Sequence, residues 1–272
     1  MKKRSLGTLA LNAPYTVWAA IFIVVPLLIV AYYAFTDDNG AFTVSNILEL
    51  KDYGSVMWRS VWYSVAATVI ALLISYPFAY FLSKQGAMSR RIQMVLVMVP
   101  MWTNLVIRTY SWMNILDNNG LINAFLKTVG LEPVQMIGTP GAVIFGMVYN
   151  YLPYMILPIY TVLSKIEPSL LEAAEDLGCN GFNKFRRVIL PLSLPGVVSG
   201  VTMVFVPSIS TFYISQQLSR SNIKLAGDII ERLIKNNNYS VGAALSLVLM
   251  VFIVISLLVM NKFSGDEGGM VI

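Results

Sequence analysis

Six long apolar segments constrain what this chain can fold into more than any other feature of its sequence. A helix that crosses the hydrocarbon core of a bilayer needs roughly 20 mainly apolar residues. The segments that meet this requirement run approximately over residues 14–36, 58–83, 92–116, 141–164, 191–214 and 241–261. Inside lipid every backbone polar group needs a partner from the protein, which favours helices. The sequence therefore predicts an all-α membrane protein with six transmembrane helices.

The composition supports this fold class and excludes several kinds of site. Hydrophobic residues make up 57% of the 272 residues and charged residues only 12%, whereas a soluble domain usually carries about 25% charged residues. The sequence contains no histidine and one cysteine, Cys179. A disulfide framework, a Cys/His metal site and a histidine-dependent nucleophile are therefore excluded. We expect no catalytic residue and no metal ligand in this chain.

The distribution of Lys and Arg between the apolar segments predicts the orientation. More of them lie in the segments that are cytoplasmic if the N-terminus is inside, in agreement with the positive-inside rule. We therefore expect both termini in the cytoplasm, with residues 1–13 as an N-terminal segment, 14–262 as the six-helix domain and 263–272 as a tail. The net charge of +5 is attributed to this topology, and no nucleic-acid partner is expected.

The predicted cytoplasmic loop at residues 165–191 carries the most informative motif. Pro168 suits the first turn of a helix, and Gly178 suits a left-handed stop after it. A second short, basic helix is expected next, and Pro191 begins the following span. The loop therefore predicts a compact helix–turn–helix at the cytoplasmic membrane surface.

The spacing within this loop is that of a known family. It consists of Glu-Ala-Ala, three residues, Gly, nine residues, an aliphatic residue, one residue and Leu-Pro. This pattern resembles the EAA loop of type I, binding-protein-dependent ABC importer permeases, although that family usually has isoleucine where this chain has Val188. In the family the loop forms coupling helices that dock on a cytoplasmic ATPase. The resemblance implies this role for Glu172, Ala173, Ala174, Gly178, Val188, Leu190 and Pro191. The alternative is a loop helix that only lies on the membrane.

The source of energy follows from the same resemblance and from one absence in the sequence. No G-x-x-x-x-G-K-[ST] phosphate loop occurs in the chain, so we expect no ATP hydrolysis and no bound cofactor in it. The resemblance implies a complex with a homologous second permease, a dimer of ATPase subunits that use ATP and Mg²⁺, and an external substrate-binding protein. It also implies a location in a bacterial inner membrane, as a multi-pass protein of the type I permease fold.

Three further runs resemble the spermidine/putrescine branch of this family. They are PMWTNLVIRTYSW at 100–112, NGLIN at 119–123 and VPSISTF at 206–212. The resemblance implies import of polyamines, which are polycations that aromatic faces and oxygen atoms attract. The candidate residues of a substrate path are Trp102, Asn104, Arg108, Tyr110, Trp112, Asp117, Tyr151, Ser208, Ser210 and Thr211. Aromatic residues also gather at membrane interfaces, and hydroxyl groups join helices, so packing roles are the alternative.

Arg108 leaves an anionic substrate as an alternative to a polyamine. An arginine within a span is a functional hypothesis by default, and its natural partner is an anion. Sulfate, phosphonate and iron permeases share much of the pattern, and pairing of Arg108 with Asp117 would require a break in the helix near Asn114. An ion-coupled secondary transporter would be expected to carry carboxylates at the centres of its spans, where this sequence has none. A membrane scaffold without transport is a third alternative, against which the EAA spacing argues.

Overall fold

The computed structural model describes residues 6–37 and 40–263, and within them the chain is helical apart from short connections and one isolated bridge between Thr36 and Phe42. The predicted all-α class is confirmed. Residues 1–5 of the predicted N-terminal segment and 264–272 of the predicted tail lie outside the described residues. The described residues form two compact units, one from those up to 55 together with 229–252, the other from 56–228 together with 253–263.

The first unit begins with a long apolar helix. This helix consists of α1 (Leu6–Ala19), a π-helical turn (Ala20–Val24) and α2 (Val25–Ala34). The short α3 (Ser45–Leu48) and a 3₁₀ turn (Glu49–Tyr53) follow it. Ala34 packs with Ala243 and Ala244 in a small core. The buried Asn46 amide donates to the carbonyl oxygens of Ala34 and Thr36 at 3.2 and 2.9 Å. These two bonds hold the connection after α2 in place.

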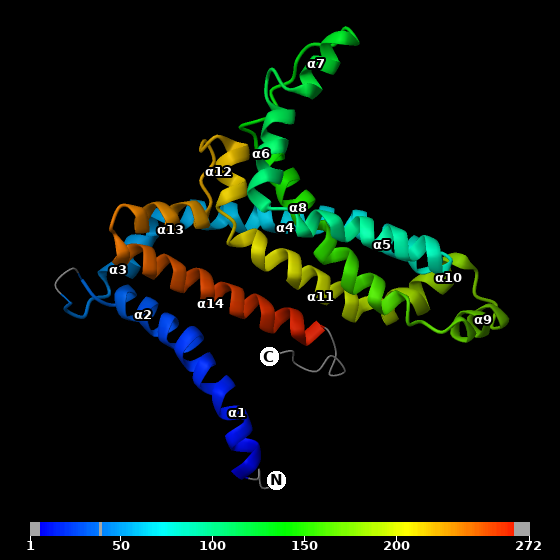
Figure 1. Ribbon diagram of the computed structural model, residues 1–272, viewed down its shortest axis with the longest axis horizontal. Helices are drawn as coiled ribbons and strands as arrows, with labels where there is room; N and C mark the ends of the chain where they lie inside the picture. Colours follow the sequence, from blue (N-terminus) through cyan, green and yellow to red (C-terminus); the bar gives the residue numbers. More distant parts are fainter. Residues whose placement is uncertain (1–5, 38–39, 264–272) are drawn as a thin grey trace. The chain divides into compact units, whose positions relative to one another are not determined.

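The remaining helices follow in chain order (Figure 1). They are α4 (Gly54–Ser83), α5 (Ala87–Trp102), α6 (Leu105–Leu116), α7 (Leu121–Thr128), α8 (Pro140–Leu163), α9 (Pro168–Asp176), α10 (Gly181–Lys184), a π-helical turn (Phe185–Ile189), α11 (Leu190–Ile209), α12 (Tyr213–Ser219), α13 (Ala226–Lys235) and α14 (Tyr239–Phe263). The boundary between the two units passes through α13 and α14.

Five of the six predicted spans correspond to helices that are long and apolar enough to cross a membrane. The described residues contain such helices at Ala13–Ala34, Ser45–Ser83, Pro140–Leu163, Gly181–Ile209 and Tyr239–Met260. The fifth predicted span differs in its limits, because its helix starts within the loop at 165–191 and ends at Ile209 rather than at residue 214.

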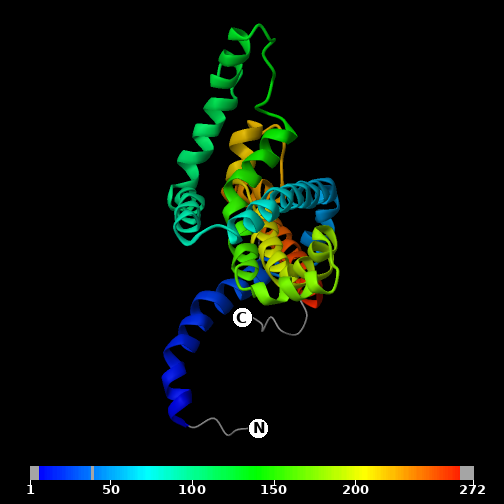
Figure 2. The same cartoon turned by 90° about the vertical axis from the view of Figure 1, so that its right-hand side faces the viewer.

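The prediction of one continuous helix over 92–116 is wrong. The chain bends by 93° between α5 and the helices that follow it, so that this segment is a broken span or a re-entrant loop (Figure 2). The Thr103 hydroxyl donates to the Pro100 carbonyl at 2.8 Å, and the Asn104 side chain accepts from the Val106 amide at 2.7 Å. These local bonds compete with the helical ones and give α6 a new N-terminus.

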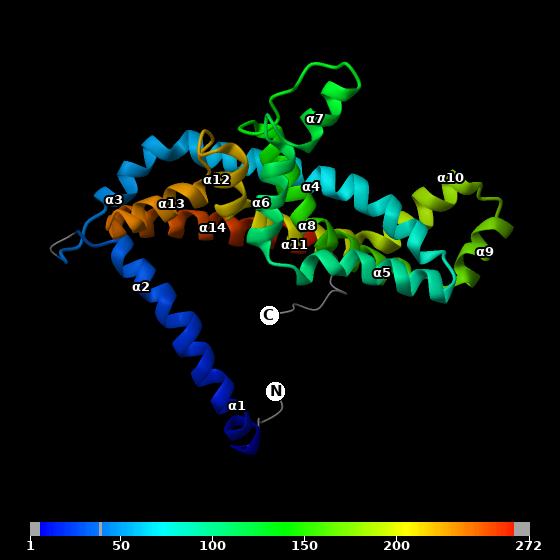
Figure 3. The same cartoon turned by 45° about the horizontal axis from the view of Figure 1, so that its top comes forward.

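Helices α8 and α11 form the centre of the second unit, where they lie alongside each other (Figure 3). Gly196 and Gly200, one turn apart on α11, face Pro158 and Met155 of α8. Small residues at this spacing let two membrane helices approach closely, which increases van der Waals contact. The spacing of the two glycines can be read from the sequence, but the α8 residues that they pack against are known only from the structure.

Replacing Gly196 with alanine should weaken this packing. The added Cβ would lie 2.8 Å from the Pro158 carbonyl oxygen, and a backbone atom gives way less readily than a side chain. We expect a loss of about 1–3 kcal/mol, measured as a lower melting temperature in detergent. Gly86→Ala is the matched control, because a Cβ there meets nothing within 4 Å and its φ is −62°. Equal melting temperatures for the two variants would contradict the close approach.

Candidate coupling site and substrate path

The predicted helix–turn–helix of the loop is confirmed in its details. Pro168 occupies the first turn of α9, and Gly178 follows the helix with a φ of +80°. The amides of Gly178 and Cys179 donate to the carbonyls of Glu175 and Ala174 at 2.8 and 3.0 Å, which satisfies the last turn. The Asn180 side chain then accepts from the Asn183 amide at 2.8 Å and starts α10. Gly178 is therefore a conformational requirement of the turn.

The seven predicted coupling residues are not equally accessible. Glu172 and Ala173 are exposed on α9, but Ala174 is only 7% exposed, so it packs within the unit and offers no docking surface in this structure. Gly178 lies in open space. Val188 and Leu190 are half-buried, and Pro191 is exposed at the start of α11. The accessible part of the motif on α9 and the turn after it is therefore the face with Glu172, Ala173 and Gly178, and Pro191 is accessible separately on α11.

An ion pair between Glu175 and Lys184 joins α9 to α10. The hydrogen bond from the Lys184 ammonium, supported by its charge, lowers the pKa of the Glu175 carboxyl below its usual range. A carboxyl with a lowered pKa stabilises the folded loop above its ordinary pKa of about 4.3, and the effect is lost on acidification. The pair therefore stays charged near neutral pH.

An aromatic cluster connects this loop to α4, and the sequence analysis did not identify it. The Phe185 ring packs edge-on against Tyr76 and Tyr80, with centroids 5.8 and 6.2 Å apart. The hydroxyl groups of Tyr76 and Ser193 lie 2.8 Å apart and share a hydrogen bond. The four-residue spacing of the two tyrosines places them on one face of α4, but the sequence does not indicate Phe185 as their partner. This cluster links the loop to both α4 and α11.

The candidate path residues of the broken third span do not form one surface. Trp102 is 74% exposed at the end of α5, and Asn104 caps α6. Trp112 packs edge-on against Phe145 and Tyr149 of α8, at 4.7 and 5.1 Å between centroids. Trp112 therefore has a packing role. Tyr110 is 44% exposed, with its ring edge-on to that of Tyr213.

Three of the candidate path residues do come together. The Tyr151 side chain lies near Thr211 and Arg108, and its hydroxyl donates to the Pro207 carbonyl oxygen at 3.4 Å. The Nε and Nη1 atoms of Arg108 are buried without a hydrogen-bond partner among the described residues. Arg108 of α6, Tyr151 of α8 and Thr211 of the segment after α11 thus lie near one another.

The other candidates have local roles. Asp117 forms an ion pair with Arg220, and α6 runs unbroken through Asn114, so the pairing of Asp117 with Arg108 does not occur. The Ser208 hydroxyl is fully buried and donates to the Val204 carbonyl at 2.6 Å, which makes it part of the helix packing. Ser210 is exposed and donates to the Val206 carbonyl at 3.1 Å. In the described part of the chain, no group of three or more His, Cys, Asp or Glu could hold a metal ion.

Comparison with known proteins identifies the family. Residues 77–264, more than half of the chain and including the loop at 165–191, match the family described as "Binding-protein-dependent transport system inner membrane component". The chain belongs to this family. Together with the apolar helices, this membership makes it a multi-pass membrane protein and a transport component.

The chain is also similar to individual proteins with a more specific description than the family. This permease is 37% identical over 253 residues to the spermidine/putrescine transport system permease protein PotB of Haemophilus influenzae, with 89% of this chain and 88% of that protein covered. It is 35% identical over 253 residues to PotB of Escherichia coli (strain K12), with 89% and 92% covered. A chain in the crystal structure of a bacterial ABC transporter for the acidic polysaccharide alginate superposes with a TM-score of 0.76 at 18% identity, over 95% of each chain. That likeness shows that the fold is the ABC importer permease fold.

Gly178→Ala should impair coupling. The left-handed backbone at Gly178 costs any other residue about 1–2 kcal/mol, so α10 would shift relative to α9. We expect ATP-dependent uptake by the reconstituted importer to fall several-fold while the amount of inserted permease stays constant. Gly181→Ala is the control in the same loop, because its φ is not positive and a Cβ there meets nothing within 4 Å. Uptake that is the same in both variants would contradict the requirement for the turn.

Phe185→Leu should separate ATP hydrolysis from transport. The change removes two ring contacts worth about 0.5–1.5 kcal/mol each beyond area burial, while an apolar residue of similar size remains. We expect the number of substrate molecules imported per ATP hydrolysed to fall, whereas hydrolysis continues. Phe182→Leu is the matched control, since Phe182 is 69% exposed and has no ring contact among the described residues. An unchanged ratio in the Phe185 variant would show that the cluster does not transmit motion.

Proposed function

We propose that this chain is the permease subunit of an ABC importer that moves polyamines, such as spermidine and putrescine, into the cytoplasm. The observation that carries this proposal is the 37% identity, over 89% of the chain, to a spermidine/putrescine permease. The resemblance to that branch in residues 100–112, 119–123 and 206–212 supports it.

The proposed complex contains this permease, a homologous second permease, two cytoplasmic ATPase subunits and an external substrate-binding protein. It lies in the bacterial inner membrane, with both termini of this chain in the cytoplasm. ATP and Mg²⁺ bind to the ATPase subunits, which dock on the loop at 165–191 through the exposed face with Glu172, Ala173 and Gly178. Closure of the ATPase dimer moves the two coupling loops together and rocks the helices around a site within the membrane.

The motion would reach the bundle by two physical connections. The π-helical turn at Phe185–Ile189 makes α10 continuous with α11, so a displacement of the loop acts directly on that helix. Phe185 also contacts Tyr76 and Tyr80 of α4. Because interlocking rings resist being pulled apart, α4 would follow the loop as well.

The chemistry of the path fits a polycation in part. Exposed aromatic faces at Trp102 and Tyr110 can attract ammonium groups by cation–π contact. The Tyr151 and Thr211 hydroxyls add oxygen acceptors. Arg108, by contrast, repels a polycation, and its partnerless buried nitrogens favour an anion. A permease for an anion such as sulfate or phosphonate is therefore the second candidate.

Uptake of radiolabelled solutes by the complete importer in proteoliposomes tests the two candidates. We expect ATP-dependent uptake of spermidine, competition by putrescine, and no competition by sulfate or phosphonate. Arg108→Gln should leave spermidine uptake unchanged or increased, since it removes a repelling charge from the path. Uptake of sulfate or phosphonate that Arg108→Gln abolishes would overturn the polyamine proposal and establish the anion permease. ATP-independent uptake would exclude both.

A further inference from the structure

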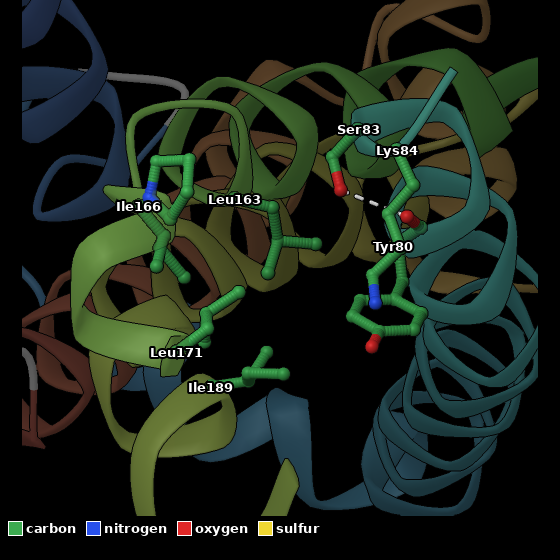
Figure 4. Close-up of a pocket in the computed structure, with 8 residues that line it drawn as sticks. Tyr80, Ser83, Lys84, Leu163, Ile166, Leu171 and Ile189 are labelled. Carbon is green, nitrogen blue, oxygen red and sulfur yellow. Dashed lines mark hydrogen bonds between the residues drawn. The ribbon is translucent and has the colours of Figure 1, made fainter. Parts of the chain in front are cut away.

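A pocket of about 270 Å³ lies beside the coupling loop, away from the candidate substrate path (Figure 4). The ends of α4 and α8, the start of α9 and the π-helical turn before α11 surround it. At about 30 Å³ for each water molecule, its volume corresponds to roughly nine waters. It can therefore admit a small headgroup with the beginning of an acyl chain, but not a whole lipid.

One wall of the pocket is apolar. Leu163, Ile166, Leu171 and Ile189 contribute branched side chains to it, and Leu163 and Ile189 are only 5% and 2% exposed. None of these side chains can donate or accept a hydrogen bond. The wall therefore suits hydrocarbon rather than a fully hydrated ion.

The facing wall carries a positive charge. Lys84 and Tyr80 lie opposite the apolar side chains (Figure 4), with the Lys84 ammonium 4.6 Å from the centroid of the Tyr80 ring. Ser83 also lines this side, but its hydroxyl already donates to the Tyr80 carbonyl at 2.8 Å. Lys84 forms no ion pair within the described residues, and the nearby Glu175 is already paired with Lys184. Lys84 is thus the one charged residue among those that line the pocket.

The pocket lies at the ends of two helices that are expected to cross the membrane. It is lined by Ser83 and Leu163, the last residues of two helices long and apolar enough to span a bilayer. Side chains at the ends of two spans lie at the level of the lipid headgroups, whichever leaflet that is. Basic pockets between transmembrane helices are known as headgroup sites.

We propose that this pocket binds an acidic phospholipid. The phosphate is held by the Lys84 ammonium and the Tyr80 hydroxyl, and the first part of an acyl chain lies against Leu163, Ile166, Leu171 and Ile189. Because Ile166, Leu171 and Ile189 belong to the loop at 165–191, the lipid would stabilise the attachment of this loop to α4 and α8. The inference uses the membrane placement of the chain and is independent of which solute it imports.

Native mass spectrometry of the purified, complete importer tests the proposal. After removal of lipid, the complex is supplied with equal amounts of phosphatidylglycerol and phosphatidylcholine, and the lipid retained per complex is counted. We expect preferential retention of phosphatidylglycerol, lowered about fivefold by Lys84→Gln, as expected for one basic residue near the membrane surface. Lys165→Gln is the matched control, because Lys165 is an exposed lysine at the start of the loop at 165–191 and does not line the pocket.

Each other result would overturn the proposal. Equal retention of the two lipids would show that the pocket recognises no charge. An equal loss in the two lysine variants would show only general attraction to the basic surface. Complete displacement of the lipid by equimolar glycerophosphate, which has a phosphate but no acyl chain, would indicate an anion site without a lipid. Melting temperatures of both variants are measured in parallel, so that a loss of folding is recognised.

Discussion

The close contact between α8 and α11 is the interaction on which the second unit of this permease depends. Lipid tails are as apolar as leucine, so helices in a bilayer gain little by burying apolar surface and depend on tight packing and hydrogen bonds. Gly196 and Gly200 bring α11 against the backbone of α8. Ser193, one turn before Gly196, adds the hydrogen bond to Tyr76. Helices α4, α8 and α11 are thereby held in one frame.

The second half of the loop at 165–191 is attached to this frame by two connections. Its second helix continues through a π-helical turn into α11, and its aromatic residue Phe185 contacts α4. The Glu175–Lys184 pair and the left-handed Gly178 hold the first helix to the second. A loop connected in this way moves as a body, which is what transmission of force from an ATPase would require. The lipid proposed beside Lys84 would contact the same junction.

The broken span explains how polar groups are placed within an apolar sequence. The bend after α5 frees backbone groups, and the side chains of Thr103 and Asn104 provide their partners. Irregular backbone at membrane depth is tolerated where protein or a cavity surrounds it. The bend directs α6 so that Arg108 lies near Tyr151, and the ion pair of Asp117 with Arg220 fastens its far end. The segment with the most polar candidates is thus also the one that departs from a straight helix.

The sequence by itself determined the elements whose causes are local. Hydrophobic runs located the spans, and Pro168 and Gly178 marked the limits of α9, because each depends on neighbours along the chain. The bend at Thr103, the burial of Ala174, the partner of Asp117 and the contact of Phe185 with α4 were decided only by the tertiary structure. Each of these depends on residues that are distant in sequence, or on a competition between helical hydrogen bonds and side-chain caps that tertiary packing settles. Hydrophobic periodicity and motif spacing do not indicate which distant residues come into contact, so these contacts could be identified only in the folded chain.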